Sequence, residues 1–279
     1  MDRALRRKFA NQAFVVICTG AALVALAALA LIMFSLLTKG VGGVDLMLFT
    51  ADTPAPDSPG GLRNAIVGSI LMCGVAMMIA VVIGVLAGTW LAEIGGNTPY
   101  GHVVRFLNDV LLSAPSILIG LFVYWWVVVP MGGFSGWAGA IALGILATPI
   151  VTRTTEDILN LQPNALREAG MALGASQWVT VRSIIWKAAG AGMLTGGLLG
   201  FARISGETAP LLFTALNNQF LSFDMSKPFA SLPGAIYPFA MSPYETWNTL
   251  AWAGALLITL AVLGVNILGR WLARDKDHK

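Results

Sequence analysis

Long stretches of this 279-residue chain contain no charged residue, and five of them are candidates for membrane spans. They cover 15 to 43 residues each and lie at residues 9–38, 64–92, 110–152, 188–202 and 246–269. An α-helix needs roughly 20 apolar residues to cross the hydrocarbon core of a bilayer, because that core is about 30 Å thick and each residue rises 1.5 Å. The pattern therefore predicts a chain that crosses a membrane several times.

Composition excludes other common classes of protein. Hydrophobic residues make up 57% of the chain and charged residues 11%, whereas about a quarter of the residues in soluble domains are charged. A soluble enzyme or a disordered chain would need the charged surface that is missing here. The cysteines and histidines are too few and too scattered for a disulfide framework or a zinc site. They are Cys18, Cys73, His102 and His278.

Six transmembrane helices are predicted, so the expected fold class is an all-α integral membrane protein. The longest uncharged stretch holds two of them, separated by a turn at residues 130–133, and the alternation typical of barrel strands is absent. The first apolar run is longer than the core of a typical signal peptide, so it is predicted to be an uncleaved helix. The helices are expected near residues 9–37, 64–93, 106–128, 137–155, 183–205 and 247–271.

The distribution of Lys and Arg predicts that both termini are cytoplasmic. With six helices, 13 of the 17 basic residues fall on the side that holds the termini and three fall on the other side. Cytoplasmic loops of membrane proteins carry such an excess. The first group is Arg3, Arg6, Arg7, Lys8, Arg105, Arg153, Arg167, Arg182, Lys187, Arg270, Arg274, Lys276 and Lys279, and the second is Lys39, Arg63 and Lys227.

Two loops are too long to be simple turns. The cytoplasmic loop at about residues 156–182 is predicted to contain a short helix that starts near Pro163 and stops at Gly174, and Ser176 can cap the helix that follows. The external segment 208–245 contains five prolines, which exclude a continuous helix. We expect this segment to pack on the outer face as short turns, partly within the interface.

Two smaller expectations concern the second span and the loop after it. Gly84 and Gly88 form a small-x-x-x-small pair, which either lets helices approach closely or faces lipid. Glu93 and Asp109 flank the short loop that follows, and we expect both at its surface.

Motifs for catalysis are missing from the sequence. It contains no G-x-x-x-x-G-K-[ST] segment to cradle ATP phosphates and no H-E-x-x-H zinc motif. No histidine lies within a predicted span to activate a serine or cysteine nucleophile. The chain is therefore not expected to be an enzyme, and a transport role fits its many helices and its one long cytoplasmic loop.

The cytoplasmic loop carries a motif. Residues 168–184 match the pattern E-A-A-x3-G-x9-I, with Glu168 as the acid and Gly174 as the glycine. This segment resembles the signature loop of permease subunits in binding-protein-dependent ABC importers. The chain departs from the pattern twice, because Gly170 replaces the second Ala and Trp-Lys stands at 186–187 in place of Leu-Pro. The alternative interpretation is an ordinary amphipathic loop helix.

The resemblance implies how the loop works. In that family the loop forms a coupling helix, here residues 163–174, which docks in a groove on a separate ATPase subunit. The acidic residue contacts the ATPase, and the glycine allows a sharp bend. The coupling residues implied for this chain are Glu168, Ala169, Gly170 and Gly174.

A second set of segments resembles the PstA-type permease subunits of phosphate-specific ABC importers. The most specific is residues 203–216, RISGETAPLLFTAL, which is similar to R-x-x-G-E-T-A-P-L-L-F in that family. The resemblance covers about residues 62–270 and implies the type-1 permease fold. The other similar segments are Asn108–Tyr124, Phe134–Ala142, Pro149–Glu156 and Phe239–Pro243.

This resemblance implies an ATP-driven importer of inorganic phosphate in the bacterial cytoplasmic membrane. The chain would form the pore with a PstC-like permease, above a dimer of PstB-like ATPase subunits, and a PstS-like periplasmic binding protein would deliver phosphate. ATP and Mg²⁺ would bind the ATPase, so no cofactor is expected on this chain. The expected organisation is a helix and external loop at 1–61, a permease domain at 62–271 and a cytoplasmic tail at 272–279.

Two alternatives remain open on the sequence. The importer could carry another oxyanion, or the chain could be a self-contained secondary anion transporter. Proton coupling in a secondary transporter would require ionisable groups inside several helices, and almost all mid-span positions here are uncharged.

Arg203 lies within the fifth predicted span, 19 residues after Ile184. An arginine at a helix centre costs roughly 2.5–3.5 kcal/mol on insertion scales, so it is a functional candidate. Its guanidinium offers a fork of donors that suits tetrahedral oxyanions. Glu207, one turn later, would compete with the anion and shorten its stay. We therefore predict a substrate-translocation site of Arg203, Glu207 and the hydroxyl of Thr208; the alternative is an ion pair at the outer interface.

Overall fold

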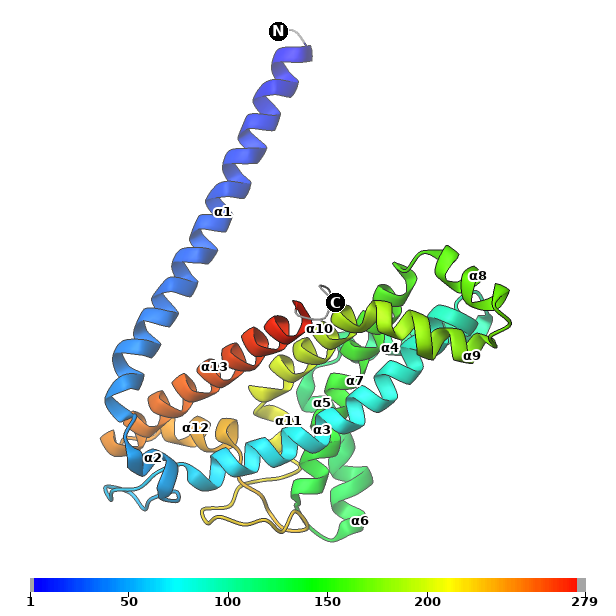
Figure 1. The fold of residues 1–279 in the computed structure, drawn as a ribbon. Helices are drawn as coiled ribbons and strands as arrows, with labels where there is room; N and C mark the ends of the chain where they lie inside the picture. The colour runs from blue at the N-terminus through cyan, green and yellow to red at the C-terminus, as the bar shows by residue number, and fades with distance from the viewer. Residues whose placement is uncertain (1–2, 275–279) are drawn as a thin grey trace.

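The computed structural model describes residues 3–274, and over that range its regular structure is entirely helical (Figure 1). Five helices are long and apolar enough to cross a membrane. They are α1 Arg3–Gly40, α3 Arg63–Trp90, α7 Gly136–Asn160, α10 Trp186–Ser205 and α13 Glu245–Arg274. π-helical turns at Leu91–Gly95 and Val181–Ile185 extend α3 and precede α10. The end of the predicted tail, with Lys276 and Lys279, lies outside the described residues.

The third predicted span is bent by 105°. Its pieces are α4 Pro99–Ser113, α5 Ser116–Val123, a π-helical turn at Tyr124–Val128 and α6 Val129–Met131. The bend follows from Pro115, which has no N–H to continue a helix and which disfavours helical backbone at the residue before it. Ala114 is accordingly extended, with ψ of 136°. The prediction of one continuous helix over 106–128 is therefore wrong. Within the described residues the bent pair brings the candidate spans to six if it counts as one span.

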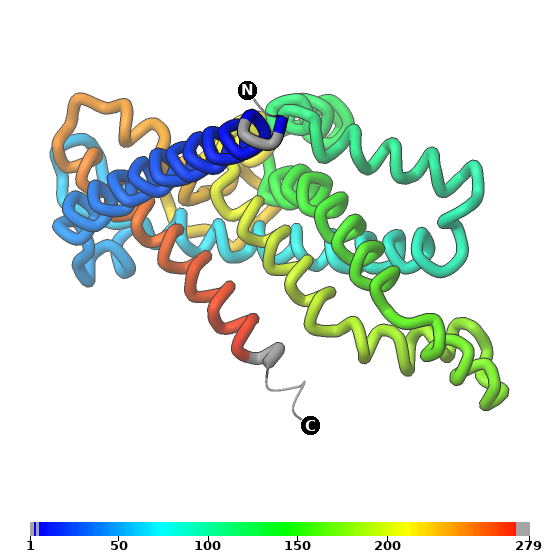
Figure 2. The backbone as a smooth tube through the Cα atoms, turned by 90° about the horizontal axis from the view of Figure 1, so that it is seen from above, coloured from blue at the N-terminus to red at the C-terminus, as the bar shows by residue number. Residues whose placement is uncertain are grey.

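Glycines let α3 pack directly against α7. A Cβ atom on Gly84 would lie 2.7 Å from Cβ of Val151, and one on Gly88 would lie 2.5 Å from the carbonyl oxygen of Thr152. Both glycines are buried, so the prediction of close helix approach is confirmed. Three glycines of α10 face α7 in the same way, namely Gly192, Gly196 and Gly200. Figure 2 shows α7, α10 and α13 running side by side.

The proline-rich segment after α10 folds partly into the bundle. Its short helices are α11 Ala209–Leu212 and α12 Leu232–Ala240. Phe229 is only 1% exposed and packs against Gly136. Backbone N–H groups at the start of α7 donate hydrogen bonds to carbonyls of the proline-rich segment. The bonds run from Ser135 to Thr214 at 3.0 Å, from Gly136 to Lys227 at 3.2 Å and from Trp137 to Met225 at 3.1 Å. The prediction of short turns is confirmed. The segment also packs deeper than predicted, against the start of α7, because irregular backbone can be buried where its polar groups find such partners.

The first helix and the loop after it join the bundle at this same end. The last turn of α1 meets α13, with Lys39 Nζ 4.8 Å from the centre of the Trp252 ring. The loop contains α2 Leu46–Thr50. Beyond it, Asp52 accepts a hydrogen bond from Arg63 at 2.9 Å and another from the backbone N–H of Leu221 at 2.9 Å. Hydrogen bonding from Arg63 lowers the pKa of Asp52, so the carboxylate stays charged and holds the loop to the proline-rich segment.

The two ends of α7 provide a test of the predicted orientation. The helix has 25 residues and is about 37 Å long. Ser226 lies near its start and Asn164 follows its end. In a variant without Cys18 and Cys73, a cysteine at position 164 should react with an impermeant maleimide only from the cytoplasm, and one at position 226 only from outside. Labelling of both from one side would refute the six-span topology.

Because α3 and α7 are in close contact, we predict that one methyl group added between them lowers the stability of the protein. Gly88→Ala should lower the free energy of unfolding by roughly 1–3 kcal/mol, the usual cost of overpacking a tight contact. The measurement is the thermal unfolding midpoint in detergent. Gly74→Ala is the control on the same helix, because no atom lies within 4 Å of a Cβ there. Equal midpoints for the two variants would contradict the packing argument.

Candidate functional site

The loop after α7 folds into a short helix with a glycine stop. α8 spans Asn164–Ala172, one residue later than predicted, because Pro163 has extended backbone and forms the N-cap. Gly174 has a φ of +81°. Its N–H donates to the Met171 carbonyl at 2.9 Å, and the Ala175 N–H donates to the Gly170 carbonyl at 3.2 Å. This is the Schellman arrangement that favours glycine, so the predicted helix stop is confirmed.

The helix that follows begins as predicted. α9 spans Gln177–Thr180, and its N-cap is Ser176, whose side chain accepts a hydrogen bond from the Val179 N–H at 3.4 Å. From α9 the chain passes through the π-helical turn into α10. The loop is therefore two short helices with a sharp turn between them, which Figure 1 shows at the far end of α7.

Gly170 explains one departure from the family pattern. It is the buried residue of α8, and a Cβ there would lie 2.6 Å from Cγ2 and 2.7 Å from Oγ1 of Thr180. An alanine would collide with α9 at this point. The missing methyl group lets α8 and α9 pack together.

The other predicted coupling residues face solvent. Glu168, Ala169 and Gly174 are exposed. Two exposed apolar side chains belong to the same loop: Leu173, directly after α8, is 87% exposed, and Trp178 of α9 is exposed as well. An exposed surface that combines apolar side chains with a carboxylate is typical of a protein-binding site. We call the exposed residues Glu168, Ala169, Leu173 and Trp178 the loop face.

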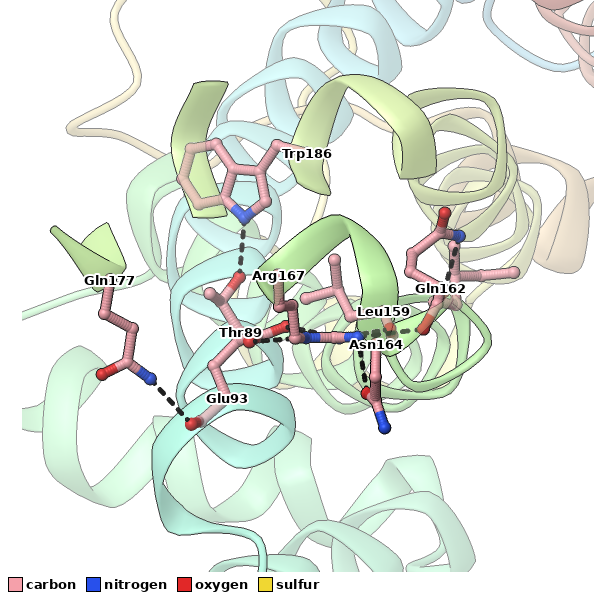
Figure 3. A network of polar contacts seen from close by, with 9 residues as sticks. Thr89, Glu93, Leu159, Gln162, Asn164, Arg167, Gln177 and Trp186 are labelled. Atoms are coloured by element: carbon pink, nitrogen blue, oxygen red, sulfur yellow. Dashed lines mark hydrogen bonds and ion pairs between the residues drawn. The ribbon is translucent and has the colours of Figure 1, made fainter. Parts of the chain in front are cut away.

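A buried ion pair holds this loop against the helices (Figure 3). Arg167 Nη2 lies 2.7 Å from Glu93 Oε1, and Arg167 Nε lies 3.0 Å from Glu93 Oε2. The Glu93 side chain is 5% exposed and that of Arg167 is 19% exposed. Hydrogen bonding to Glu93 raises the pKa of Arg167. The expectation that Glu93 lies at the loop surface is wrong.

The sequence contains one signal for this buried pair, which the prediction of a surface position did not take into account. Glu93 is the first charge after 29 uncharged residues, so it sits at the very end of a span and close to other spans. The π-helical turn at Leu91–Gly95 directs it toward the loop. Two further bonds join the same region, from Gln177 Nε2 to the Glu93 carbonyl at 3.1 Å and from Trp186 Nε1 to Thr89 Oγ1 at 3.1 Å.

A second buried ion pair joins α4 to α7. Arg105 Nε donates to Glu156 Oε1 at 2.6 Å, and Arg105 Nη1 donates to the Gly96 carbonyl at 2.6 Å. Nearby, Asn108 Nδ2 donates to the Pro149 carbonyl at 3.2 Å. A buried carboxylate such as Glu156 needs a charged partner, and this pair fixes α4 across the end of the bundle.

The predicted translocation residues gather at the other end of α10. Arg203 lies in the last turn of the helix, and Glu207 follows it. Arg203 Nη1 and Glu207 Oε1 form an ion pair. The Arg203 side chain is 52% exposed, whereas that of Glu207 is 8% exposed. Thr208 is half-buried and lines an open cavity of about 360 Å³ with Gly206 and Tyr237.

The described part of the chain encloses Arg203 only in part. Within residues 3–274, Glu207 Oε1 contacts Arg203 and has no hydrogen bond to another group. The carboxylate balances the arginine charge from the buried side, and the Arg203 side chain as a whole is 52% exposed. α10 has 20 residues, so about 30 Å separates this site from the loop end of the helix.

In the described part of the chain, no group of three or more His, Cys, Asp or Glu side chains is placed to hold a metal ion. The candidate sites are thus an arginine with a buried carboxylate at one end of the bundle and the loop face at the other.

Comparisons with known proteins agree with these features. A family model described as a binding-protein-dependent transport system inner membrane component matches residues 80–278. The phosphate transport system permease protein PstA of Haemophilus influenzae is 57% identical over 88% of this chain and 87% of its own length. That of Pasteurella multocida is 54% identical over 95% of this chain and 94% of its own length.

A solved structure shows the same fold. It is a chain of the MetNI methionine ABC transporter in an inward-facing conformation, 20% identical, with a TM-score of 0.64. The match covers 76% of this chain and 94% of that chain. The helices described above therefore form the type-1 permease fold.

The positive φ of Gly174 predicts which substitutions the loop accepts. Gly174→Val should loosen the end of α8, because a left-handed backbone costs roughly 1–2 kcal/mol for a residue with a Cβ and more for a branched one. Gly174→Asn should behave nearly as the wild type, since asparagine tolerates this conformation. The measurement is the rate of trypsin cleavage at Arg167 and Arg182 in membranes, expected to rise about tenfold for Val. Equal rates for Val and Asn would show that the backbone conformation does not matter.

Proposed function

The chain belongs to the family of binding-protein-dependent transport system inner membrane components, and from this membership we propose that it is the permease subunit of an ATP-driven importer of inorganic phosphate. It is a multi-pass membrane protein of this family. The observation that carries the substrate assignment is the 57% identity to a PstA permease over 88% of the chain. The exposed guanidinium of Arg203, beside the buried Glu207, supplies matching chemistry for an oxyanion.

The chain supplies the path, and other subunits supply the energy. The loop face docks on a PstB-like ATPase dimer, where ATP and Mg²⁺ bind, and Glu168 offers it a carboxylate. This chain itself binds no nucleotide and catalyses no reaction. A PstC-like permease completes the pore, and a PstS-like binding protein delivers phosphate at the end that holds Arg203.

Phosphate passes by alternating access. Closure of the ATPases moves the loop, and the helices that carry the loop open the path toward the outside. Arg203 attracts the anion there, Thr208 adds a hydroxyl, and Glu207 competes with the anion so that it is released. Another oxyanion would meet the same groups. A self-contained secondary transporter is not favoured, because family membership implies a partner ATPase.

Removal of the Arg203 charge tests this proposal. Arg203→Gln should reduce phosphate uptake by whole cells at least tenfold, because the anion loses its charged partner at the mouth of the path. Lys187→Gln is the matched control: it removes one positive charge from the other end of α10 and should leave uptake nearly unchanged.

A second variant separates transport from folding. Arg203→Gln alone leaves a buried, unpaired carboxylate, which is destabilising. The double variant Arg203→Gln/Glu207→Gln removes that carboxylate charge as well and should restore the amount of protein in the membrane without restoring uptake. Normal uptake by either variant would overturn the assignment of Arg203 to the phosphate path.

A further inference from the structure

We propose that Arg167 is a positioning residue that locks the coupling helix α8 to the ends of α3 and α7, so that the three helices move as one body. The inference rests on the proposed function, because it assigns the lock to transmission between the ATPase and the path. Arg167 does not lie on the loop face; it points the other way, into the protein (Figure 3).

Arg167 is bonded to two different helices at once. Its Nε and Nη2 donate hydrogen bonds to the two carboxylate oxygens of Glu93, which lies directly after α3. Its Nη2 also donates to the Leu159 carbonyl at 2.8 Å, and its Nη1 donates to the Gln162 carbonyl at 2.9 Å. Those two carbonyls belong to the end of α7 and the turn after it. The Leu159 carbonyl also accepts a hydrogen bond from the backbone N–H of Gln162 at 3.1 Å. A carbonyl oxygen can accept two hydrogen bonds, so the guanidinium adds the second one while it pairs with the carboxylate.

The loop needs such a lock because its own helices are short. α8 has nine residues and α9 has four, and isolated helices of this length are not stable in water. Tertiary contacts must therefore hold α8 in place. Arg167 supplies charged contacts to α3 and α7, while Gly170 packs against Thr180 of α9.

The lock connects the loop with the phosphate site through packed helices. α3 and α7 touch through Gly84 and Gly88, and α7 touches α10 through glycines along the length of that helix. A displacement of α8 therefore reaches α10, and with it Arg203, through the helix bundle as well as through α9. Without the lock, α8 could follow the ATPase while α3 and α7 stay in place.

The adjacent residue, Glu168, is exposed and is proposed to contact the ATPase. Successive residues of a helix differ by 100° in direction, so Arg167 can bind the bundle while Glu168 faces outward. The helix has one charged residue for each task, and each can be removed without the other.

The test uses the complete transporter in lipid vesicles with its ATPase and binding protein. The variant is Arg167→Gln/Glu93→Gln, which removes both charges and so leaves no unpaired one. We expect the ATPase subunits to remain bound, because the loop face is intact. ATP hydrolysis should no longer rise when the phosphate-loaded binding protein is added, and phosphate transported per ATP hydrolysed should fall at least tenfold.

A second measurement follows the position of α8 itself. Backbone amides at 164–173 should exchange with deuterium at least tenfold faster in the double variant, whether or not phosphate is present. The matched control is Arg153→Gln/Asp157→Asn, an exposed ion pair near the same end of α7 at 3.4 Å, which should change neither readout.

The outcomes are distinct. Faster exchange with bound ATPase and lost coupling supports the lock. Unchanged exchange, or full coupling despite faster exchange, overturns it. If the wild-type complex moves no phosphate, the proposed function fails, and the exchange measurement still decides whether Arg167 holds α8.

Discussion

The contact between α3 and α7 determines where α4 and the coupling helix α8 attach to the bundle. Gly84 and Gly88 bring the two backbones closer than side chains would allow, so the ends of these helices lie together at the loop side of the bundle. Two carboxylates are buried there, Glu93 after α3 and Glu156 within α7. A buried carboxylate is costly without a partner. Glu93 meets Arg167 of α8, and Glu156 meets Arg105 of α4. The helix contact thus creates the places at which α4 and α8 attach.

The two ends of the bundle each hold an arginine, and the two arginines differ in how many of their donors have partners within the chain. At the loop end, Arg167 has its donors engaged within the chain and is mostly buried. At the other end, Arg203 contacts one carboxylate and is half exposed. An arginine with all its partners supplied by the protein stabilises a structure, whereas one with open donors can bind an anion. This difference, rather than charge alone, is the reason we propose a positioning role for one arginine and a substrate role for the other.

Local chemistry predicted much of the fold, and contacts distant in sequence account for the errors. Five spans, the stop at Gly174 and the cap at Ser176 follow from uncharged length and from turn chemistry within a few residues. The bend at Pro115 had a local cause, but uninterrupted hydrophobicity masked it. The burial of Glu93 and the inward course of the segment around Phe229 depend on residues more than 70 positions away. The residues proposed for translocation are together in space because they are together in sequence, so pattern alone could assemble them. Their task in transport remains a prediction.

The departure from the family pattern at Gly170 and the unexpected burial of Glu93 have a common structural cause. By pattern alone, glycine in place of alanine looks like a mild loss of helix propensity. In the structure it is the point where α8 rests on Thr180, with no room for a methyl group. Three positions away along the helix, Arg167 reaches Glu93. A wider spacing between α8 and α9 would draw the guanidinium away from the carboxylate and from the carbonyls at the end of α7. The small residue at 170 and the charged residue at 167 are therefore parts of one arrangement, in which close packing brings the ion pair within bonding distance.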